Sequence, residues 1–205
     1  MTTDATKELR GSIQNWSTDG DWKIYGTLNF STHSHLRNVN ADDVCGKMWR
    51  SYFGTIDRAL FGQQRKYQHR FQRSVFVHRG RYGDNPHIHF LASLPFPAKD
   101  SCILLNAVWS SMFPEAASPV SNEITPLMSK IAASNYGLHE FTNLTSDTHD
   151  LRLSYYKSGM SADLRDDAVA RLKSKTKSQH LLSARLSFPT HVRAAEARFH
   201  MRHGS

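Results

Sequence analysis

Two histidines stand one residue apart in the sequence NPHIHFLA, where the chain continues into an apolar run. Successive side chains of a β-strand point to opposite faces, so His87 and His89 would share a face if this segment is a strand. Two imidazoles on one face can bind a single divalent metal ion, and His78 on the preceding predicted strand could supply a third nitrogen. The rival pair, His33 and His35, lies in a stretch that is polar on all sides and is typical of a loop.

A tyrosine that could act as a nucleophile occurs in the sequence SNYGLHEF. In a helix, Tyr136, His139 and Glu140 would lie on one face because they are three and four residues apart. A phenol, whose ordinary pKa is about 10, is a poor nucleophile until a metal or another cation stabilises the phenolate or polarises the target. A tyrosine nucleophile is therefore expected beside a metal site. By itself, Tyr136 is one of seven tyrosines and is better interpreted as a core or surface residue.

The chain carries a formal net charge of +8, which favours a polyanionic partner. Residues 65–81, RKYQHRFQRSVFVHRGR, hold six lysines and arginines and no acid, interleaved with aromatic residues. Cations neutralise phosphates and aromatic rings stack on unpaired bases, so this segment is typical of a surface for single-stranded nucleic acid. Its predicted nucleic-acid-binding residues are Arg65, Lys66, Arg70, Arg73, Arg79 and Arg81. Residues 171–202 form a second basic zone, and a solvated basic surface is the alternative interpretation of both.

With 205 residues, 39% of them hydrophobic and 21% charged, the chain has the composition of a globular protein with one domain and an extension. No apolar run is long enough to cross a membrane, so no membrane partner is expected. The N-terminal sequence MTTDATKELRG lacks the features of a secretory signal, which predicts an intracellular, cytoplasmic protein. Cys45 and Cys102 lack CxxC spacing and are expected to act as small hydrophobic residues.

Hydrophobic periodicity divides the chain into a polar leader at residues 1–20, a folded domain at 21–145 and a basic extension of that domain at 146–205. Within the domain, strands are predicted at residues 21–31, 73–80, 87–95 and 118–127, and helices at 41–62, 99–113 and 128–141. The Gly-Asp-Asn-Pro turn between the second and third strands predicts a hairpin. This order predicts an α+β fold, with an antiparallel sheet of ferredoxin-like type and flanking helices.

The sequences IYGTLNFS, VHRGRYGDNPHIHFLASLP and ITPLMSKIAASNYGLHEF resemble, in order and spacing, the three motifs of the HUH endonucleases. The resemblance is strongest to the rolling-circle replication initiators, or Rep proteins, and covers residues 22–145. It implies an HUH endonuclease domain with an antiparallel sheet and flanking helices. It also implies that His87 and His89 bind Mg²⁺ or Mn²⁺, and that Tyr136 attacks a DNA phosphodiester to leave a 5′-phosphotyrosine and a free 3′-hydroxyl. For the third metal ligand it leaves two candidates, His78 and Glu140.

The chain departs from the Rep pattern in one position of the tyrosine motif. Where the motif has a lysine three residues after the tyrosine, this chain has His139, which when protonated can still donate to a phosphate or to the phenolate. Tyr155 and Tyr156 in LSYYKSG are competing nucleophiles, and a two-tyrosine mechanism stays open. No GxxxxGK[ST] sequence occurs, so duplex opening would need supercoiling, an origin hairpin or a separate helicase.

The predicted function is that of a metal-dependent enzyme that nicks single-stranded DNA at an origin or transfer site and initiates rolling-circle-type replication of a mobile genetic element. Relaxases and single-tyrosine transposases of the same superfamily use the same catalytic parts. Two further hypotheses come from other classes of protein. One is a Rep-like protein that binds DNA or RNA without cutting it, and the other is a metal nuclease in which the histidines activate water and Tyr136 is structural.

Overall fold

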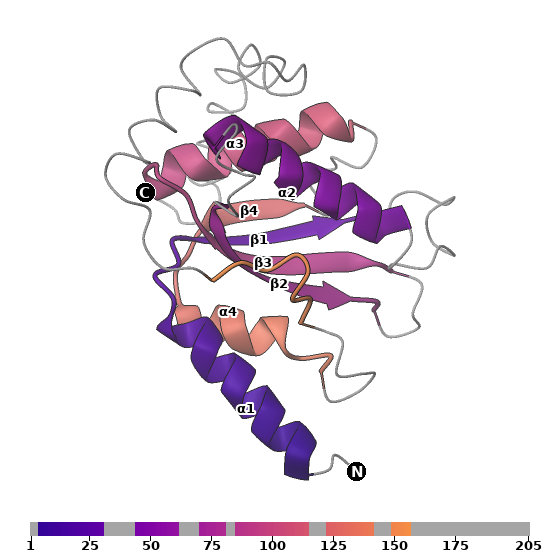
Figure 1. Cartoon of the computed structure of the whole chain (residues 1–205), viewed down its shortest axis with the longest axis vertical. Coiled ribbons are helices and arrows are strands. Elements are labelled where there is room, and N and C mark those ends of the chain that lie inside the picture. The colour runs from indigo at the N-terminus through magenta and orange to yellow at the C-terminus, as the bar shows by residue number, and fades with distance from the viewer. Residues whose placement is uncertain are drawn as a thin grey trace, which may run out of the picture.

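The computed structural model describes residues 4–30, 44–61, 70–80, 85–114, 122–141 and 149–156. In chain order, its helices and strands are α1 (Asp4–Asp19), β1 (Ile24–Asn29), α2 (Gly46–Phe61), β2 (Gln72–His78), β3 (His87–Ser93), α3 (Ala98–Met112), β4 (Glu123–Pro126) and α4 (Lys130–Gly137). In these residues a four-stranded antiparallel sheet is flanked by helices (Figure 1). The predicted α+β class is therefore confirmed.

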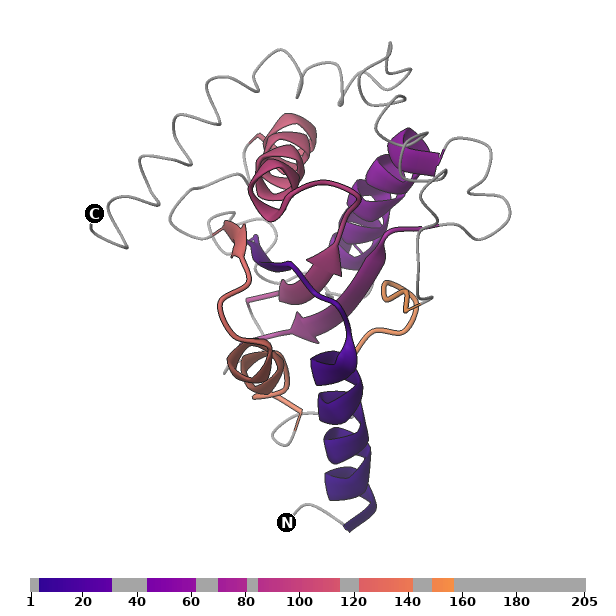
Figure 2. The same ribbon diagram turned by 90° about the vertical axis from the view of Figure 1, so that its left-hand side faces the viewer.

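The order of the strands across the sheet is β2-β3-β1-β4. β1 pairs with β3 and β4, and β2 forms the predicted hairpin with β3. Because α2 connects β1 to β2 and α3 connects β3 to β4, the β-α-β-β-α-β order is that of a ferredoxin-like fold. α2 and α3 cover one face of the sheet, whereas α4 and the end of α1 lie against the other (Figures 1 and 2).

The main hydrophobic core lies between the sheet and helices α2 and α3. Alternate residues of β1 and β3 point to this face, and the apolar ones pack against both helices. The core includes Ile24, Leu28, Ile88 and Phe90 from the strands, Trp49, Phe53 and Ile56 from α2, and Leu105, Val108 and Trp109 from α3. Gly26 is needed in the middle of β1, because a Cβ at this position would lie 2.2 Å from Cζ of Phe90. The Phe90 ring therefore occupies the space above β1.

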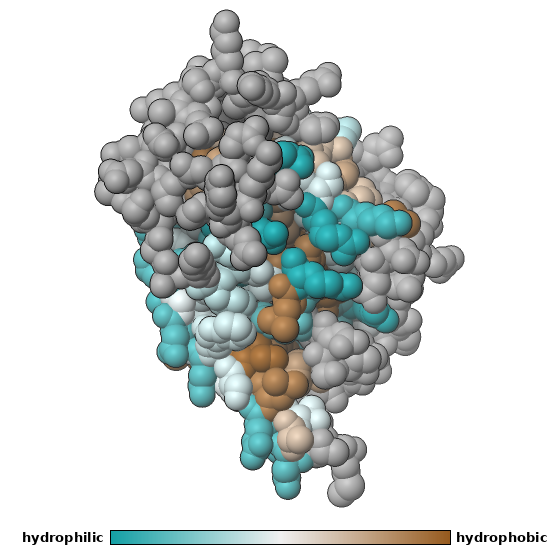
Figure 3. Space-filling model, in the orientation of Figure 1, coloured by the Kyte–Doolittle hydropathy of each residue, from teal (hydrophilic) through white to brown (hydrophobic). Residues whose placement is uncertain are grey.

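The segment predicted as a polar leader forms α1 over most of its length. Ile13 on this helix belongs to a small apolar cluster with Phe76, Leu138 and Phe141. Trp16 stacks on Tyr156, with the ring centroids 4.0 Å apart. In Figure 3 a narrow apolar strip runs down the middle of the face shown toward α1, with hydrophilic residues on both sides. Few residues of α1 are buried against the rest of the protein, so most of its positions are polar and the sequence did not indicate a helix.

Helix α4 is shorter than predicted, but it lies close against the open face of the sheet. It begins after Ser129, whose hydroxyl accepts a hydrogen bond from the backbone N–H of Ala132 at 3.2 Å. Near its end, Gly137 lies so close to β2 that a Cβ there would be 2.7 Å from Cδ2 of Phe76. The helix therefore presents its last turn to the strands that carry the histidines. Among the helices that the structure describes, none has the length and apolar character that a membrane crossing needs.

Candidate metal centre

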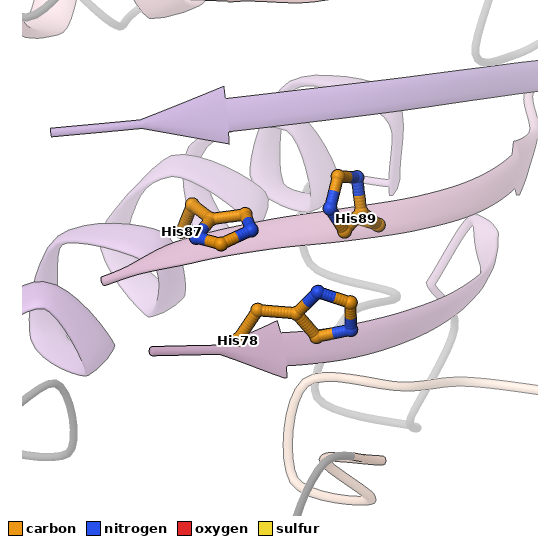
Figure 4. Close-up of side chains that lie close together, drawn as sticks. All are labelled: His78, His87 and His89. Atoms are coloured by element: carbon orange, nitrogen blue, oxygen red, sulfur yellow. The ribbon is translucent and has the colours of Figure 1, made fainter. Parts of the chain in front are cut away.

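Three histidines from two neighbouring strands converge on the sheet face that α4 covers (Figure 4). His78 on β2 pairs directly with His87 on β3, and His89 follows two residues later on the same face. The ring centroid of His78 lies 5.2 Å from that of His87 and 4.6 Å from that of His89, and the His87 and His89 centroids are 5.0 Å apart. One ring nitrogen from each of the three lies within 4.8 Å of the other two. This set of three residues is called the histidine triad below.

Hydrogen bonds to backbone carbonyls determine which nitrogen of His78 and His87 carries a proton. Nε2 of His78 donates to the carbonyl oxygen of Gly137 at 2.7 Å, and Nδ1 of His87 donates to that of Asn85 at 2.7 Å. The other nitrogen of each neutral ring then carries a lone pair. A second hydrogen bond of this kind is typical of histidines that bind a metal, because it sets the tautomer and the ring orientation.

His89 is held by two hydroxyl groups from β1. Its Nδ1 lies 2.8 Å from Oη of Tyr25 and 2.9 Å from Oγ1 of Thr27. Within the described residues, Nε2 of His89 and Nδ1 of His78 are buried side-chain nitrogens without a hydrogen-bond partner. Buried polar atoms are rarely left unpaired, and unpaired nitrogens within a cluster of three imidazoles are typical of a metal-binding site. The residues of the triad therefore fit a bound divalent cation.

Burial keeps the triad in the neutral form that a ligand requires. The pKa of His78 is lowered to about 4, mainly by burial and to a smaller extent by the nearby His87 and His139, whereas the hydrogen bond to Gly137 and the carboxylate of Glu140 act in the opposite direction. Burial also lowers the pKa of His87 and, well below its ordinary value, that of His89. At neutral pH the three rings are therefore neutral, each with a proton on one nitrogen, and the imidazolium proton does not have to leave before a metal binds.

Glu140, the other candidate for the third ligand, joins the end of α4 to the turn after β2. Its Oε2 accepts from the backbone N–H of Arg79 at 2.9 Å, and its Oε1 accepts from that of Gly80 at 3.1 Å. Gly80 has a φ of +71°, a conformation that glycine adopts without strain. Oε1 lies 3.9 Å from Nδ1 of His78 and 3.8 Å from Nε2 of His139. The carboxylate thus lies beside the triad and forms a second possible ligand group with His78 and His139.

The structure places Tyr136 directly beside the triad. Its ring lies 4.8 Å from that of His89 and 4.9 Å from that of His139, measured between centroids. The tyrosine is 55% exposed, so its side chain is open to a partner from solution. Nδ1 of His139 donates to the carbonyl oxygen of Tyr136 at 2.6 Å, which leaves Nε2 of His139 as the nitrogen without a proton in the neutral ring.

The two competing tyrosines lie at the edge of β2. The backbone of Tyr155 pairs with that of Arg73 through hydrogen bonds of 2.7 and 2.9 Å. The hydroxyl of Tyr156 lies 2.7 Å from Oγ of Ser74 and also forms a hydrogen bond with Nε2 of His149. Burial raises the pKa of the Tyr156 phenol. Tyr156 therefore belongs to a buried polar group under Trp16, unlike the exposed Tyr136.

The prediction that Arg73 contacts nucleic acid is wrong. Its side chain is 3% exposed, and its guanidinium forms a bidentate ion pair with Asp57 of α2, with N–O distances of 2.9 and 3.0 Å. Arg73 is two residues from Val75 on β2 and shares its face of the sheet, which packs against α2 and α3, instead of the face that carries the triad. Among the other predicted cations, Arg70 is half-buried and Arg79 is exposed. Arg65, Lys66 and Arg81 lie outside the described residues.

Sequence reasoning missed Tyr25 and Thr27. The only available signal was that they alternate with apolar residues along β1 and therefore share a face. Their contact with His89 depends on the register that pairs Thr27 with His89 across β1 and β3. Burial raises the pKa of Tyr25 to about 12, against the opposing effect of a hydrogen bond from Thr27. At neutral pH the Tyr25 phenol therefore keeps its proton.

Comparisons with known proteins assign neither a family nor a function to this site. No protein-family model, no curated protein and no solved structure matches the chain.

Proposed function

We propose that this chain is a metal-dependent endonuclease and strand transferase of the HUH type that acts on single-stranded DNA in the cytoplasm. The observation that carries the proposal is the position of Tyr136, whose exposed ring lies 4.8 Å from that of His89 in the triad. A phenol needs a nearby cation to act as a nucleophile, and the triad provides a site for one. The resemblance to Rep proteins makes initiation of rolling-circle replication the process in which such an enzyme acts.

His78, His87 and His89 would hold the cation, with Glu140 next to them. When bound, the cation would polarise the scissile phosphate and stabilise the negative charge that develops on it. Three imidazole nitrogens suit Mn²⁺ or another transition-metal ion better than Mg²⁺, which prefers an octahedral set of oxygen ligands. Of the two predicted metals, Mn²⁺ is therefore the better fit to this set of donors.

The reaction that we propose exchanges one phosphate ester for another. Oη of Tyr136 forms a bond to phosphorus while the bond from phosphorus to the 3′ oxygen breaks, and the phenol proton leaves as the 3′ oxygen gains one. His139 is the residue that takes up the phenol proton, because its ring lies 4.9 Å from that of Tyr136 and its Nε2 carries the lone pair. The 5′-phosphotyrosine keeps the energy of the ester bond, so a 3′-hydroxyl can reverse the step and rejoin the strand.

Charge and exposure support a nucleic acid as the substrate. The chain has a formal net charge of +8, and Arg79 lies exposed at the turn that Glu140 binds. The expected partners are single-stranded DNA or an origin hairpin, together with a separate helicase. Relaxases and single-tyrosine transposases would use the same site, and the DNA sequence that is cut decides between these roles.

Metal-assisted hydrolysis is a second candidate, because three histidines also form the ligand set of catalytic zinc sites that activate water. In that reaction Tyr136 would have no covalent role. Free 5′-phosphate ends and an active Tyr136→Phe variant would favour it.

The experiment that tests the proposal is a denaturing-gel assay for a covalent protein–DNA adduct. The protein is mixed with Mn²⁺ and a pool of labelled single-stranded oligonucleotides that includes candidate origin sequences. The variants compared are Tyr136→Phe, His87→Ala and, as a matched control, Tyr156→Phe, which removes the same hydroxyl from a tyrosine at the edge of β2. We expect a metal-dependent adduct in the wild type and the control, and none in the other two.

Other outcomes distinguish the alternatives. An adduct that survives Tyr136→Phe but not Tyr156→Phe would move the nucleophile to the later pair of tyrosines. Cut DNA without an adduct would indicate hydrolysis, and binding without cleavage would indicate the non-cleaving Rep-like protein.

A further inference from the structure

We infer that Tyr25 and Thr27 act as positioning residues that select the metal-binding tautomer of His89. The inference rests on the metal site of the proposed function, but it does not depend on Tyr136 or on DNA cleavage. Both side chains come from β1, and neither of them is itself a candidate ligand. Their role would be to keep a proton on Nδ1 of His89, so that the lone pair of Nε2 faces the other two histidines.

The contacts of His89 differ from those of the other two histidines. His78 and His87 each have one backbone carbonyl as a partner, and a carbonyl can only accept a hydrogen bond. The partners of His89 are two hydroxyl groups, at 2.8 Å in Tyr25 and 2.9 Å in Thr27, and either could donate as well as accept. A hydroxyl pair holds the tautomer less strictly than a carbonyl, so each hydroxyl is expected to compensate partly for loss of the other.

Burial makes this choice of tautomer matter. His89 is 2% exposed, so water cannot replace a missing partner at Nδ1. Without the hydroxyls, either an N–H at Nδ1 stays buried and unpaired, or the proton moves to Nε2 and blocks the nitrogen that should bind the metal. The ring itself is held in place by Tyr25, whose plane lies nearly parallel to it at 10°, with 5.9 Å between centroids. A phenylalanine keeps this stacking and removes only the hydroxyl.

The register of the sheet explains why β1 supplies both groups. Thr27 is the direct partner of His89 across β1 and β3, and Tyr25 is two residues away on the same face. Both hydroxyls therefore approach the same edge of the imidazole ring. This leaves Nε2, on the opposite side of the ring, to the triad.

The test is a Co²⁺ titration of the full-length protein, followed by the visible absorption of the bound ion. It compares the wild type with Tyr25→Phe, Thr27→Val and the double variant. Tyr156→Phe is the matched control, because it also removes a phenol that hydrogen-bonds a histidine, but that histidine is His149 at the edge of β2. Loss of a partner of a ligating histidine typically weakens metal binding by about 10–100-fold. We expect that range for the double variant, less than about tenfold for each single variant, and no change for the control.

A second measurement needs no metal and separates positioning from a structural effect. Long-range ¹H–¹⁵N NMR spectra of the metal-free protein report which nitrogen of His89 carries the proton. We expect the proton on Nδ1 in the wild type and the control, and a shift of the population toward Nε2 in the double variant.

The outcomes of these measurements are distinct. Co²⁺ affinities of the double variant and the control that agree within about twofold of the wild type would overturn the inference, as would a wild-type proton on Nε2 of His89. If the wild type binds no Co²⁺, the metal centre of the proposed function fails and the inference fails with it. If Co²⁺ binding responds as expected and no DNA is cut, the inference stands and only the proposed nuclease activity fails.

Discussion

Substitution of Gly137 by alanine tests how closely α4 must approach the sheet for the site to work. A Cβ at this position would lie 2.7 Å from Cδ2 of Phe76, whereas ordinary contacts begin at 3.4 Å. The Phe76 ring is 1% exposed and cannot turn into solvent. Either the ring or the last turn of α4 must therefore move by at least about 0.7 Å, because a close-packed interior has no room to absorb the extra methyl group.

The size of the effect follows from this displacement. Overpacking of a well-packed interior costs about 1–3 kcal/mol, and for a chain of this size each kcal/mol lowers Tm by about 2–4 °C. We expect a decrease in Tm of about 2–12 °C. The same turn carries Tyr136 and the carbonyl that binds His78 at 2.7 Å. Because a shift of about 1 Å at a reacting group can reduce a rate about 100-fold, adduct formation should slow by that order.

Thermal unfolding and the rate of adduct formation are the two measurements. Gly11→Ala is the matched control, since a Cβ at Gly11 in α1 meets no atom within 4 Å and alanine there should gain up to about 1 kcal/mol. Adding Phe76→Leu to Gly137→Ala removes the ring that the new methyl group meets and should restore part of the rate. If Gly137→Ala and Gly11→Ala have the same Tm and rate, the argument from close approach is refuted.

Three further predictions concern stability. Arg73→Ala leaves Asp57 buried without its partner and should lower the free energy of unfolding by about 3–5 kcal/mol in chemical denaturation. The control Arg79→Ala, at an exposed position, should lower it by at most about 0.5 kcal/mol. Equal losses in the two variants would contradict the buried ion pair. Burial lowers the pKa of His149 to about 4, so the unfolded chain takes up this proton first as the pH falls. The free energy of unfolding should therefore be independent of His149 above about pH 6.5 and fall by about 3 kcal/mol between pH 6.5 and 4. Urea titrations at several pH values should show that His149→Gln lacks this decrease in the free energy of unfolding. If the free energy of unfolding of the variant falls with pH as steeply as that of the wild type, His149 is not a buried neutral imidazole. Mn²⁺ at 100 times its Kd should add about 2.7 kcal/mol to the free energy of unfolding, and neither EDTA-treated wild type nor His87→Ala should show the gain.

The sequence by itself determined the order of the elements from β1 to α4, the hairpin and two of the three histidines on one strand, whereas α1 was predicted as a polar leader. These features are local: strand alternation, a turn between apolar runs and a spacing of two residues can be recognised without knowledge of the fold. His87 and His89 share a face for this reason. The sequence also placed His78 on the partner strand of the predicted hairpin, from which it could supply a third nitrogen, but its direct pairing with His87 was decided by the register of the sheet.

Only the tertiary structure decided which residues surround the triad. Tyr25 and Thr27 reach His89 because β1 pairs with β3 from a distance of more than sixty residues along the chain. Tyr136 lies beside His89 because Gly137 lets α4 approach Phe76. These contacts depend on strand register and helix packing between distant segments, which no local pattern in the sequence encodes.

The error at Arg73 has the same physical origin. In the sequence it belongs to a basic run, and the composition of that run favoured a nucleic-acid surface. In the structure Arg73 lies on the face of the sheet that packs against α2, and its guanidinium donates two hydrogen bonds to the buried carboxylate of Asp57. Net charge is a property of composition, but whether a charge faces solvent or a buried partner is decided by the face of the sheet on which its residue lies.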